Sequence, residues 1–403
     1  MERLYWNNDW KFAETWEEAM KEAVYPENEM EDVRLPHTCK ELPYHYFDEH
    51  AYQMLCGYRR HFMAPEAWQG KSVELTFEGV AHDAVVYVNG TEVKAHHCGY
   101  TAFSVELAKY LKYGEDNVLA VRVDSRENLN IPPFGYAIDY MTFGGMYREV
   151  YVQVRNKTHL ADVFVKSQIH PLQVTTEITV QNISDGITLQ QEIRKKGEGA
   201  YSPLGKKPVK QANVQTVFPV QEICLWEPEN PHLYEIRTSL WKNGEMIDAR
   251  VDITGFREAG FRKDGFYLNG KKLRLRGLNR HQSYPYVGYA APASMQIFDA
   301  DILKKELGVN AVRTSHYPQS QDFIRRCDEI GLLVFTEFPG WQHIGDEIWK
   351  KQAVENVKDM VEQYRNHPSV ILWGVRINES GDDDAFYRET NRVAHELDPT
   401  RQT

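Results

Sequence analysis

The sequence predicts a multidomain chain in which a jelly-roll β-sandwich and an immunoglobulin-like β-sandwich precede the N-terminal part of a (β/α)8 TIM barrel. Three observations lead to this fold class. Residues 1–157 carry short segments of alternating apolar and polar side chains, and residues 158–257 have the length and strand number of an immunoglobulin-like domain. Residues 258–403 alternate short apolar runs with helical patterns. We therefore expect domain boundaries near residues 157 and 257.

The first unit is predicted from period-two patterns and from a turn signal. Val73, Leu75 and Phe77 alternate with polar residues, and the apolar run 85–88 leads into an Asn-Gly pair at 89–90. Asn-Gly is typical of two-residue hairpin turns, because both of its residues tolerate a positive φ. Short strands separated by Gly, Pro and Asn favour a jelly-roll sandwich.

The second unit repeats the strand signals at the spacing of a small sandwich. Its predicted strands lie around residues 163–165, 174–180, 214–220 and 233–240. A second Asn-Gly pair at 243–244 predicts another hairpin. The polar stretch 195–210 has three glycines and two prolines, so we interpret it as a solvated loop.

The third unit changes character, because near-continuous apolar strands now alternate with helices. Strands are predicted at residues 272–277, 310–314, 332–335 and 370–373, and helices at 296–307, 323–330, 346–364 and 383–397. Gly331 ends the second helix. Residues 258–403 are too few for a complete barrel of about 250 residues. They could form a smaller doubly wound sheet, but we favour a longer protein truncated within its barrel.

Composition excludes several classes of function. Lys and Arg total 47 against 58 Asp and Glu, a net charge of −11, so we expect no nucleic-acid partner. No segment approaches the roughly 20 apolar residues of a membrane helix, and the start has no apolar core of a signal peptide. Five scattered cysteines without CxxC spacing favour buried or half-buried free thiols in a reducing compartment. We therefore expect a cytoplasmic protein without a membrane partner.

Polar and aromatic residues follow all four predicted barrel strands. In a parallel barrel, the reactive residues lie at the C-terminal ends of the strands, which meet on one face. A single His there has an ordinary explanation in capping or loop chemistry, but four clusters in register indicate a site for hydroxyl-rich substrates. The clusters are Asn279, Arg280, His281 and Gln282; Arg313, Ser315, His316 and Tyr317; Glu337, Trp341 and His343; and Asn378, Glu379 and Ser380.

Glu379 is the most informative of these residues. It follows a fully apolar strand, and a carboxyl group emerging from such a strand is expected to be partly desolvated. Desolvation raises a carboxyl pKa toward the range that suits a general acid. Glu379 could equally cap the start of the next helix, so the residue alone does not decide between the two roles.

Two long motifs resemble glycoside hydrolase family 2, which includes bacterial β-galactosidases and β-glucuronidases. They are Asn-Ala-Val-Arg-Thr-Ser-His-Tyr-Pro at 310–318, and Arg-Asn-His-Pro-Ser-Val-Ile-Leu-Trp at 365–373, which leads to Asn378-Glu379-Ser380. Residues 79–124 are similar to the sugar-binding, galactose-binding-like jelly roll of that family, and residues 226–234 to its immunoglobulin-like domain.

The resemblance implies roles for individual residues. Glu379 matches the general acid/base of the family, and Asn378 matches the residue that contacts the sugar 2-hydroxyl. His316 and His343 match histidines that line the sugar site, and Asp139 resembles an aspartate that reaches the sugar from the first domain. With them, Arg313 and Trp341 complete the expected substrate-binding residues, all present in this sequence.

The implied activity is the hydrolysis of terminal non-reducing β-D-galactose residues by a retaining mechanism. The family nucleophile is a Glu late in the barrel, beyond this chain, so we expect the chain to be incomplete and inactive. Gln282 and Tyr284 stand where metal-dependent relatives have ligands, and both are poor ligands for Mg²⁺, so we expect no metal and no cofactor.

Two alternatives and two further expectations remain. The chain could belong to a β-glucuronidase or another exo-β-glycosidase, or it could be a non-catalytic carbohydrate-binding protein that uses only its jelly roll. The expected partner is a β-linked oligosaccharide or glycoside. Because family members are often oligomers, a homo-oligomer is also expected.

Overall fold

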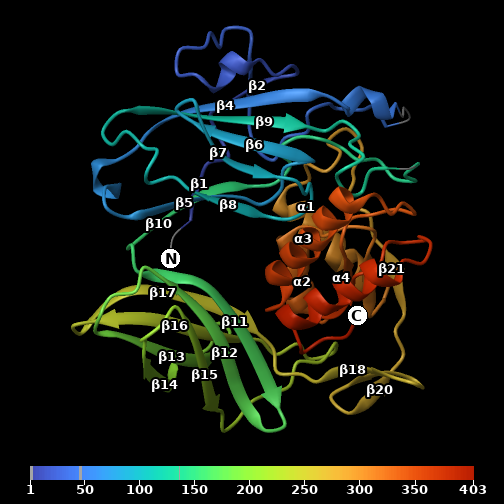
Figure 1. Cartoon of the computed structure of the whole chain (residues 1–403). Helices are drawn as coiled ribbons and strands as arrows, with labels where there is room; N and C mark the ends of the chain where they lie inside the picture. The colour runs from blue at the N-terminus through green and yellow to red at the C-terminus, as the bar shows by residue number, and fades with distance from the viewer. Residues whose placement is uncertain (1–2, 45–47, 136) are drawn as a thin grey trace.

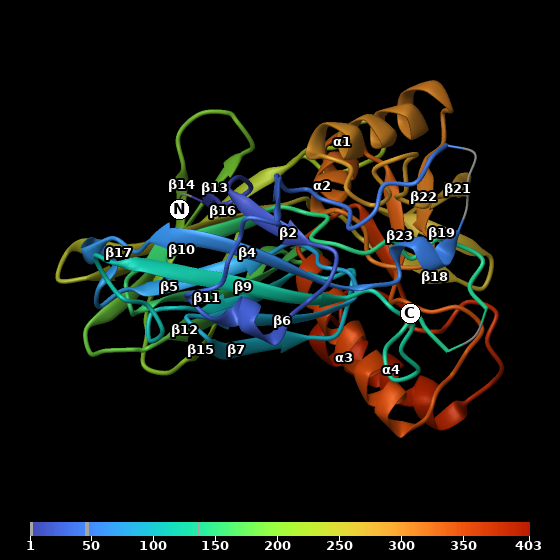
Figure 2. The same ribbon diagram turned by 90° about the horizontal axis from the view of Figure 1, so that it is seen from above.

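The computed structural model describes residues 3–44, 48–135 and 137–403. Three units are visible in Figure 1: a β-sandwich formed by the N-terminal third, a second sandwich coloured green to yellow, and an α/β unit coloured orange to red. Figure 2 shows the same chain from above, where the helices of the α/β unit lie beside both sandwiches. The predicted order of two sandwiches and a partial barrel is confirmed.

The first sandwich consists of two antiparallel sheets, in the strand orders β1-β10-β5-β8 and β3-β2-β4-β9-β6-β7. Its elements are β1 (Leu4–Tyr5), β2 (Trp10–Ala13), η1 (Glu18–Lys21), β3 (Glu31–Val33), η2 (Glu49–Tyr52), β4 (Leu55–Met63), η3 (Glu66–Trp68), β5 (Ser72–Phe77), β6 (Asp83–Val88), β7 (Thr91–His96), β8 (Phe103–Glu106), β9 (Asp116–Asp124) and β10 (Val150–Arg155).

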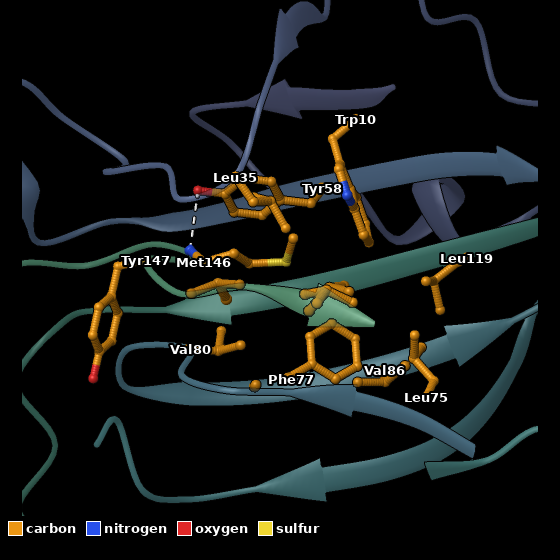
Figure 3. Close-up of a cluster of buried hydrophobic side chains, with 14 of the residues drawn as sticks. Trp10, Leu35, Tyr58, Leu75, Phe77, Val80, Val86, Leu119, Met146 and Tyr147 are labelled. Atoms are coloured by element: carbon orange, nitrogen blue, oxygen red, sulfur yellow. Dashed lines mark hydrogen bonds between the residues drawn. The ribbon is translucent and has the colours of Figure 1, made fainter. Parts of the chain in front are cut away.

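The core of this sandwich follows the alternation seen in the sequence. Val73, Leu75 and Phe77 of β5 are fully buried. Figure 3 shows Leu75 and Phe77 beside Val86 of β6, inside the space between the two sheets. The hairpin at residues 89–90 joins β6 to β7 with positive φ at both positions, as the Asn-Gly pair predicts.

The second sandwich has seven strands in two antiparallel sheets, β11-β12-β15 and β14-β13-β16-β17, and confirms the immunoglobulin-like prediction. Its strands are β11 (His159–Ile169), β12 (Leu172–Gln181), β13 (Ile187–Lys195), β14 (Ser202–Pro208), β15 (Asn213–Pro219), β16 (Tyr234–Lys242) and β17 (Glu245–Thr254). The second Asn-Gly hairpin joins β16 to β17.

One prediction in this unit is wrong. The stretch 195–210 is not a loop throughout, because β14 lies within it and pairs with β13. β14 is an edge strand, and proline is tolerated at a sheet edge because the missing N–H costs no ladder bond there. Pro203 and Pro208 therefore do not prevent the strand from forming.

The third unit contains a parallel four-stranded sheet with helices between its strands. Its elements are β18 (Ala259–Arg262), β19 (Gly265–Leu268), β20 (Lys271–Leu273), β21 (Gly277–Asn279), α1 (Ala293–Asp301), the π-helical turn η4 (Ile302–Glu306), β22 (Ala311–Thr314), α2 (Gln321–Ile330), β23 (Leu333–Glu337), α3 (Glu347–Tyr364), β24 (Val370–Gly374) and α4 (Asp384–Leu397).

The strand order β21-β22-β23-β24 distinguishes a barrel from a doubly wound sheet. A doubly wound sheet reverses its strand order once, whereas right-handed crossovers between successive neighbours keep all the helices on one face. Gln402 also pairs in parallel with Leu372 on the free edge of β24, where a fifth strand of a barrel would lie. The sheet therefore has the topology of half a TIM barrel.

The first barrel strand is displaced from its predicted place at residues 272–277. Lys271–Leu273 forms β20, which pairs antiparallel with β19, and the parallel sheet begins only at β21. The apolar residues that suggested a barrel strand, Leu273 and Leu275, pack against a cluster that contains Phe266 and Leu268 of β19 as well as Leu333 and Ile371 of the barrel strands. The apolar pattern therefore comes from a small antiparallel sheet packed against the barrel strands, and not from a barrel strand.

Three further predictions concern the cysteines, the end of α2 and the length of the helices. Four cysteines are buried and free, whereas Cys224 is exposed, so the expectation of buried or half-buried thiols is wrong for that residue. Gly331 has a φ of 70° at the end of α2, as predicted for a helix C-terminus. Among the described helices, none is both long and apolar enough to cross a membrane.

A carboxyl group with a raised pKa lies where α3 meets the jelly roll. Thr101 Oγ1 donates to Asp359 Oδ2 at 3.3 Å, and the Ala102 N–H donates to Gln363 Oε1 at 2.8 Å. Burial, and then the charge of Glu362, raises the pKa of Asp359 from 3.8 to about 6. The folded chain therefore holds more protons than the unfolded chain between those values, so stability falls as pH rises through this window.

We expect the Asp359→Asn variant to be more stable than the wild type by about 1 kcal/mol at pH 7.5, because it removes the buried charge and keeps an acceptor for Thr101. The gain should shrink toward zero at pH 4. Urea unfolding at the two pH values measures it, with Glu347→Gln at the exposed start of α3 as control. Equal stability of the Asn variant and the wild type at pH 7.5 would contradict the expectation.

Candidate active site

Three neighbouring strands bring four of the predicted site residues together. Arg313 lies in β22, His316 follows that strand, Glu337 is the last residue of β23, and Asn378 follows β24. Because β22, β23 and β24 are parallel, their C-terminal ends meet at one edge of the sheet. The candidate site is therefore built at the end of the half-barrel where the chemistry was expected.

A buried carboxylate joins these residues into one network. Glu337 is 2% exposed; its Oε1 lies 2.6 Å from His316 Nδ1, and its Oε2 accepts from Arg313 Nη2 at 2.8 Å. The same guanidinium nitrogen donates to Asn378 Oδ1 at 2.8 Å. A hydrogen bond on each carboxylate oxygen fixes the orientation of both partners. Glu337 thus orients His316 directly and Asn378 through Arg313.

Glu379 stands at the open side of this network. Its φ is 55°, in the left-handed region, and its Oε2 accepts a hydrogen bond from Gln342 Nε2 at 3.0 Å. The Gln342 N–H also donates to the Asn378 carbonyl at 2.8 Å. Gln342 therefore holds both the Glu379 side chain and the peptide group that precedes Glu379.

The expected desolvation of Glu379 is wrong for this chain, because the residue is exposed. β24 ends at Gly374, but Val375 and Ile377 after it are still buried. Glu379 follows them in a left-handed conformation and is exposed, so a carboxyl group two residues beyond a buried apolar side chain is not itself desolvated.

Aromatic rings form one wall of the site. The rings of Trp341 and His316 lie 5.0 Å apart, and Trp341 is 9% exposed. Tyr140 comes from the jelly-roll unit, and its ring lies 6.0 Å from that of His316 and 5.2 Å from that of His281. Two units of the chain therefore contribute to the same wall.

The hydroxyl group of Tyr140 is notable because it is buried and has no hydrogen-bond partner among the described residues. Burial raises the pKa of Tyr140 well above 10, so the group is a neutral O–H donor at physiological pH. Burial, followed by the charge of His316, lowers the pKa of His281. An unpaired buried donor beside the imidazole of His281 is a position that a hydroxyl-bearing ligand can complete.

Asp139 and His343 lie differently from the central network. Asp139 is exposed beside Tyr140, and its charge acts on His281, which places it near the aromatic wall. The ring of His343 lies 5.8 Å from that of Trp349 and packs against Gly135. Within the described parts of the chain, no contact joins His343 to the central network, so its role in sugar binding stays a prediction.

The two residues at the expected metal position are engaged elsewhere. Gln282 is fully buried, and its Oε1 accepts from Arg148 Nη2 at 3.1 Å. Tyr284 donates its hydroxyl to Asp299. Arg148 also donates to the Pro318 carbonyl at 3.2 Å, so this jelly-roll arginine fastens the first unit to the loops that carry His281 and His316.

Sequence reasoning did not identify Tyr140 or Gln342 as site residues. Each is the immediate neighbour of a residue that it did select, Asp139 and Trp341. Residues adjacent to a loop residue in the sequence lie close to it in space, so Tyr140 and Gln342 could have been selected for their position next to Asp139 and Trp341. Which of two neighbours points toward the site depends on the loop conformation, including the positive φ of Gln342.

Family models match the chain in three consecutive parts. The sugar-binding domain model of glycosyl hydrolases family 2 matches residues 32–155, the model of glycosyl hydrolases family 2 itself matches 158–257, and its TIM barrel domain model matches 260–403. The chain belongs to glycosyl hydrolase family 2. This family membership accounts for both sandwiches and for the half-barrel.

Individual relatives agree with the family. The chain is 47% identical to a β-galactosidase of Thermoanaerobacter pseudethanolicus and 46% identical to one of Thermoanaerobacterium thermosulfurigenes, over 99% and 98% of its length. It spans 55% and 57% of the lengths of those two β-galactosidases. A solved β-glucuronidase of Bacteroides uniformis superposes with a TM-score of 0.88 at 28% identity, covering 99% of this chain and 52% of that one.

Proposed function

We propose that the protein containing this chain hydrolyses terminal β-D-galactosides with retention of configuration, and that Glu379 is its general acid/base. The observation that carries the proposal is the meeting of Glu379 and Asn378 with the network of Arg313, Glu337 and His316 at the C-terminal ends of three barrel strands. The β-galactosidases at 46–47% identity support the choice of sugar.

The proposed mechanism assigns each residue a task. Glu379 protonates the leaving oxygen and later removes a proton from the attacking water. The Asn378 amide and the His316 imidazole bind sugar hydroxyls, and Trp341 presents an apolar ring surface to the C–H face of the sugar. Asp139 and His343 would contact the sugar from the loops that carry them.

A second carboxylate is required as nucleophile, about 5–5.5 Å from the first in a retaining enzyme. Glu337 lies in the site, but both of its oxygens are held by His316 and Arg313. A carboxylate paired on both oxygens is a weak nucleophile, so we assign Glu337 an orienting role. We propose that the nucleophile lies outside this chain and that residues 1–403 alone do not turn over substrate.

A galactoside is favoured over a glucuronide by the electrostatics of the network. A C6 carboxylate needs a cationic partner with free donors. Arg313 is the cation of the network, and it is already paired with Glu337 and Asn378. A glucuronide is the second candidate substrate, because the chain is similar in structure to the B. uniformis β-glucuronidase.

The test is a comparison of aryl β-D-galactoside, β-D-glucuronide and β-D-glucoside as substrates for the longest open reading frame that contains this chain. The galactoside should have the highest kcat/KM. A preference for the glucuronide would replace the proposed substrate. If no glycoside is hydrolysed but galactose binds, the chain belongs to a carbohydrate-binding protein.

Tyr140→Phe tests the unpaired hydroxyl at the aromatic wall. We expect the variant to be at least as stable as the wild type, because a buried donor without a partner costs about 1–3 kcal/mol. We expect kcat/KM for the galactoside to fall roughly threefold to tenfold, as one hydrogen bond to the sugar is lost. Steady-state kinetics and urea unfolding measure the two effects.

Tyr147→Phe is the matched control, because that hydroxyl already donates to the Gly99 carbonyl at 2.6 Å. It should lose stability and keep its activity. An unchanged kcat/KM for Tyr140→Phe would exclude a contact between this hydroxyl and the sugar. A cytoplasmic location, homo-oligomer formation and the absence of metal, cofactor and nucleic-acid partners stay predictions.

A further inference from the structure

A cleft far from the candidate active site lies where the second sandwich meets the N-terminal end of the half-barrel. Its volume is about 390 Å³, and it lies between the end of β11, the segment that follows β17, and the loops before β24 and after α4. Asn366 fastens the two units at this place, accepting from the Val165 N–H at 2.9 Å and donating to the Val163 carbonyl at 2.8 Å.

More cationic side chains than carboxylates line the cleft. The lining includes one carboxylate, Glu258, and four cationic side chains: Lys166, Arg257, Arg365 and Arg401. Hydroxyl groups of Ser167, Thr254 and Thr400 also line it.

Two of the guanidinium groups are held side by side. Arg257 Nη2 and Arg401 Nε donate to the same acceptor, the Val370 carbonyl, at 2.6 and 2.7 Å. Arg401 is neutralised by Asp398, whose Oδ2 accepts from its Nη1 at 2.6 Å. The remaining bond of Arg257 goes from Nε to the Pro368 carbonyl at 2.5 Å.

Arg257 therefore lacks a counter-charge. The two other cations of the lining have carboxylate partners, Lys166 with Glu177 and Arg365 with Asp162. For Arg257, no carboxylate lies within ion-pair distance among the described residues. Burial, and then the charge of Arg401, lowers its pKa to about 9, so it is still charged at neutral pH.

We propose that this cleft is a binding site for a phosphate-type oxyanion, with Arg257 as its central ligand. An oxyanion supplies the charge that Arg257 lacks and accepts from its Nη1, because Nε and Nη2 are already held by the Pro368 and Val370 carbonyls. Lys166 is the second cationic donor, because Arg401 and the hydroxyl groups of the lining already have partners in the protein. Because the site bridges two units, a bound anion stabilises their junction.

The experiment is isothermal titration of the chain with inorganic phosphate at pH 7.5, with ionic strength held constant by chloride. We expect saturable binding of one phosphate. Glucose 6-phosphate is titrated in parallel, since a site open to phosphate monoesters binds both and a site for the free ion binds only the first. Absence of saturable phosphate binding overturns the proposal.

Three variants locate the site. Lys166→Gln removes a cation at the cleft and should weaken phosphate binding severalfold, whereas Lys206→Gln removes an exposed cation of β14 outside the cleft and should leave it unchanged. Arg257→Met should weaken binding by at least tenfold. If its lost backbone bonds prevent folding, the comparison of the two lysine variants decides. Equal binding by Lys166→Gln and Lys206→Gln shows an adventitious ion only.

Discussion

Glu379→Gln should lower kcat for an aryl galactoside by roughly 10³-fold in the protein that contains the whole barrel, because the amide cannot protonate the leaving oxygen. The free energy of unfolding should change by less than about 0.5 kcal/mol, since the side chain is exposed and the amide oxygen can still accept from Gln342. Steady-state kinetics and urea unfolding measure the two quantities.

The leaving group identifies the step that is lost. A dinitrophenolate departs without protonation, so kcat/KM of its galactoside, which reports the first step, should be much less affected than kcat/KM of a phenyl galactoside. Glu347→Gln is the matched control, because this carboxylate at the start of α3 is also exposed. A uniform loss for both leaving groups would mean that Glu379 is not the acid.

Glu337→Gln should lower both activity and stability. The carboxylate is buried and pairs with His316 and Arg313, and its replacement leaves Arg313 without its charge partner. We expect a loss of about 2–4 kcal/mol in the free energy of unfolding, because breaking a buried pair strands the remaining charge. We expect kcat/KM to fall roughly 10²-fold, since small displacements of His316 and Asn378 disturb the bound geometry.

Glu235→Gln separates the two effects. Glu235 is 9% exposed and pairs with Arg194 at 2.6 Å in the second sandwich, so it resembles Glu337 in burial and partner but lies in another unit. This variant should lose stability and keep its kcat/KM when assayed well below its melting temperature. If Glu337→Gln kept full activity, the network would have only a structural role.

The elements that follow from local patterns were predictable. Alternation placed β5 and β6, the Asn-Gly pairs placed two hairpins, and the helical patterns placed α2, α3 and α4. Each of these signals depends on residues within one or two turns of the chain. β20 was misplaced because Leu273 and Leu275 have the pattern of a barrel strand but find apolar partners in a neighbouring antiparallel sheet.

The candidate site was predictable in its members and not in its contacts. Strand ends in a parallel sheet meet on one face, so the sequence alone is enough to group Arg313, His316 and Asn378. That Glu337 binds Arg313 and His316 at once, and that Tyr140 arrives from another unit, depends on side-chain directions across the sheet.

By itself, the sequence determined the order of the three units, most of their strands and helices, and the set of polar residues at the barrel strand ends. Periodicity and turn chemistry depend on residues that are close together in the sequence, so the sequence alone is enough to predict the elements that they specify. Only the tertiary structure decided that Glu379 is exposed, that Glu337 holds the network together, and that Arg257 and Arg401 share one carbonyl. Burial and pairing depend on residues far apart in the chain, whose approach no local pattern records.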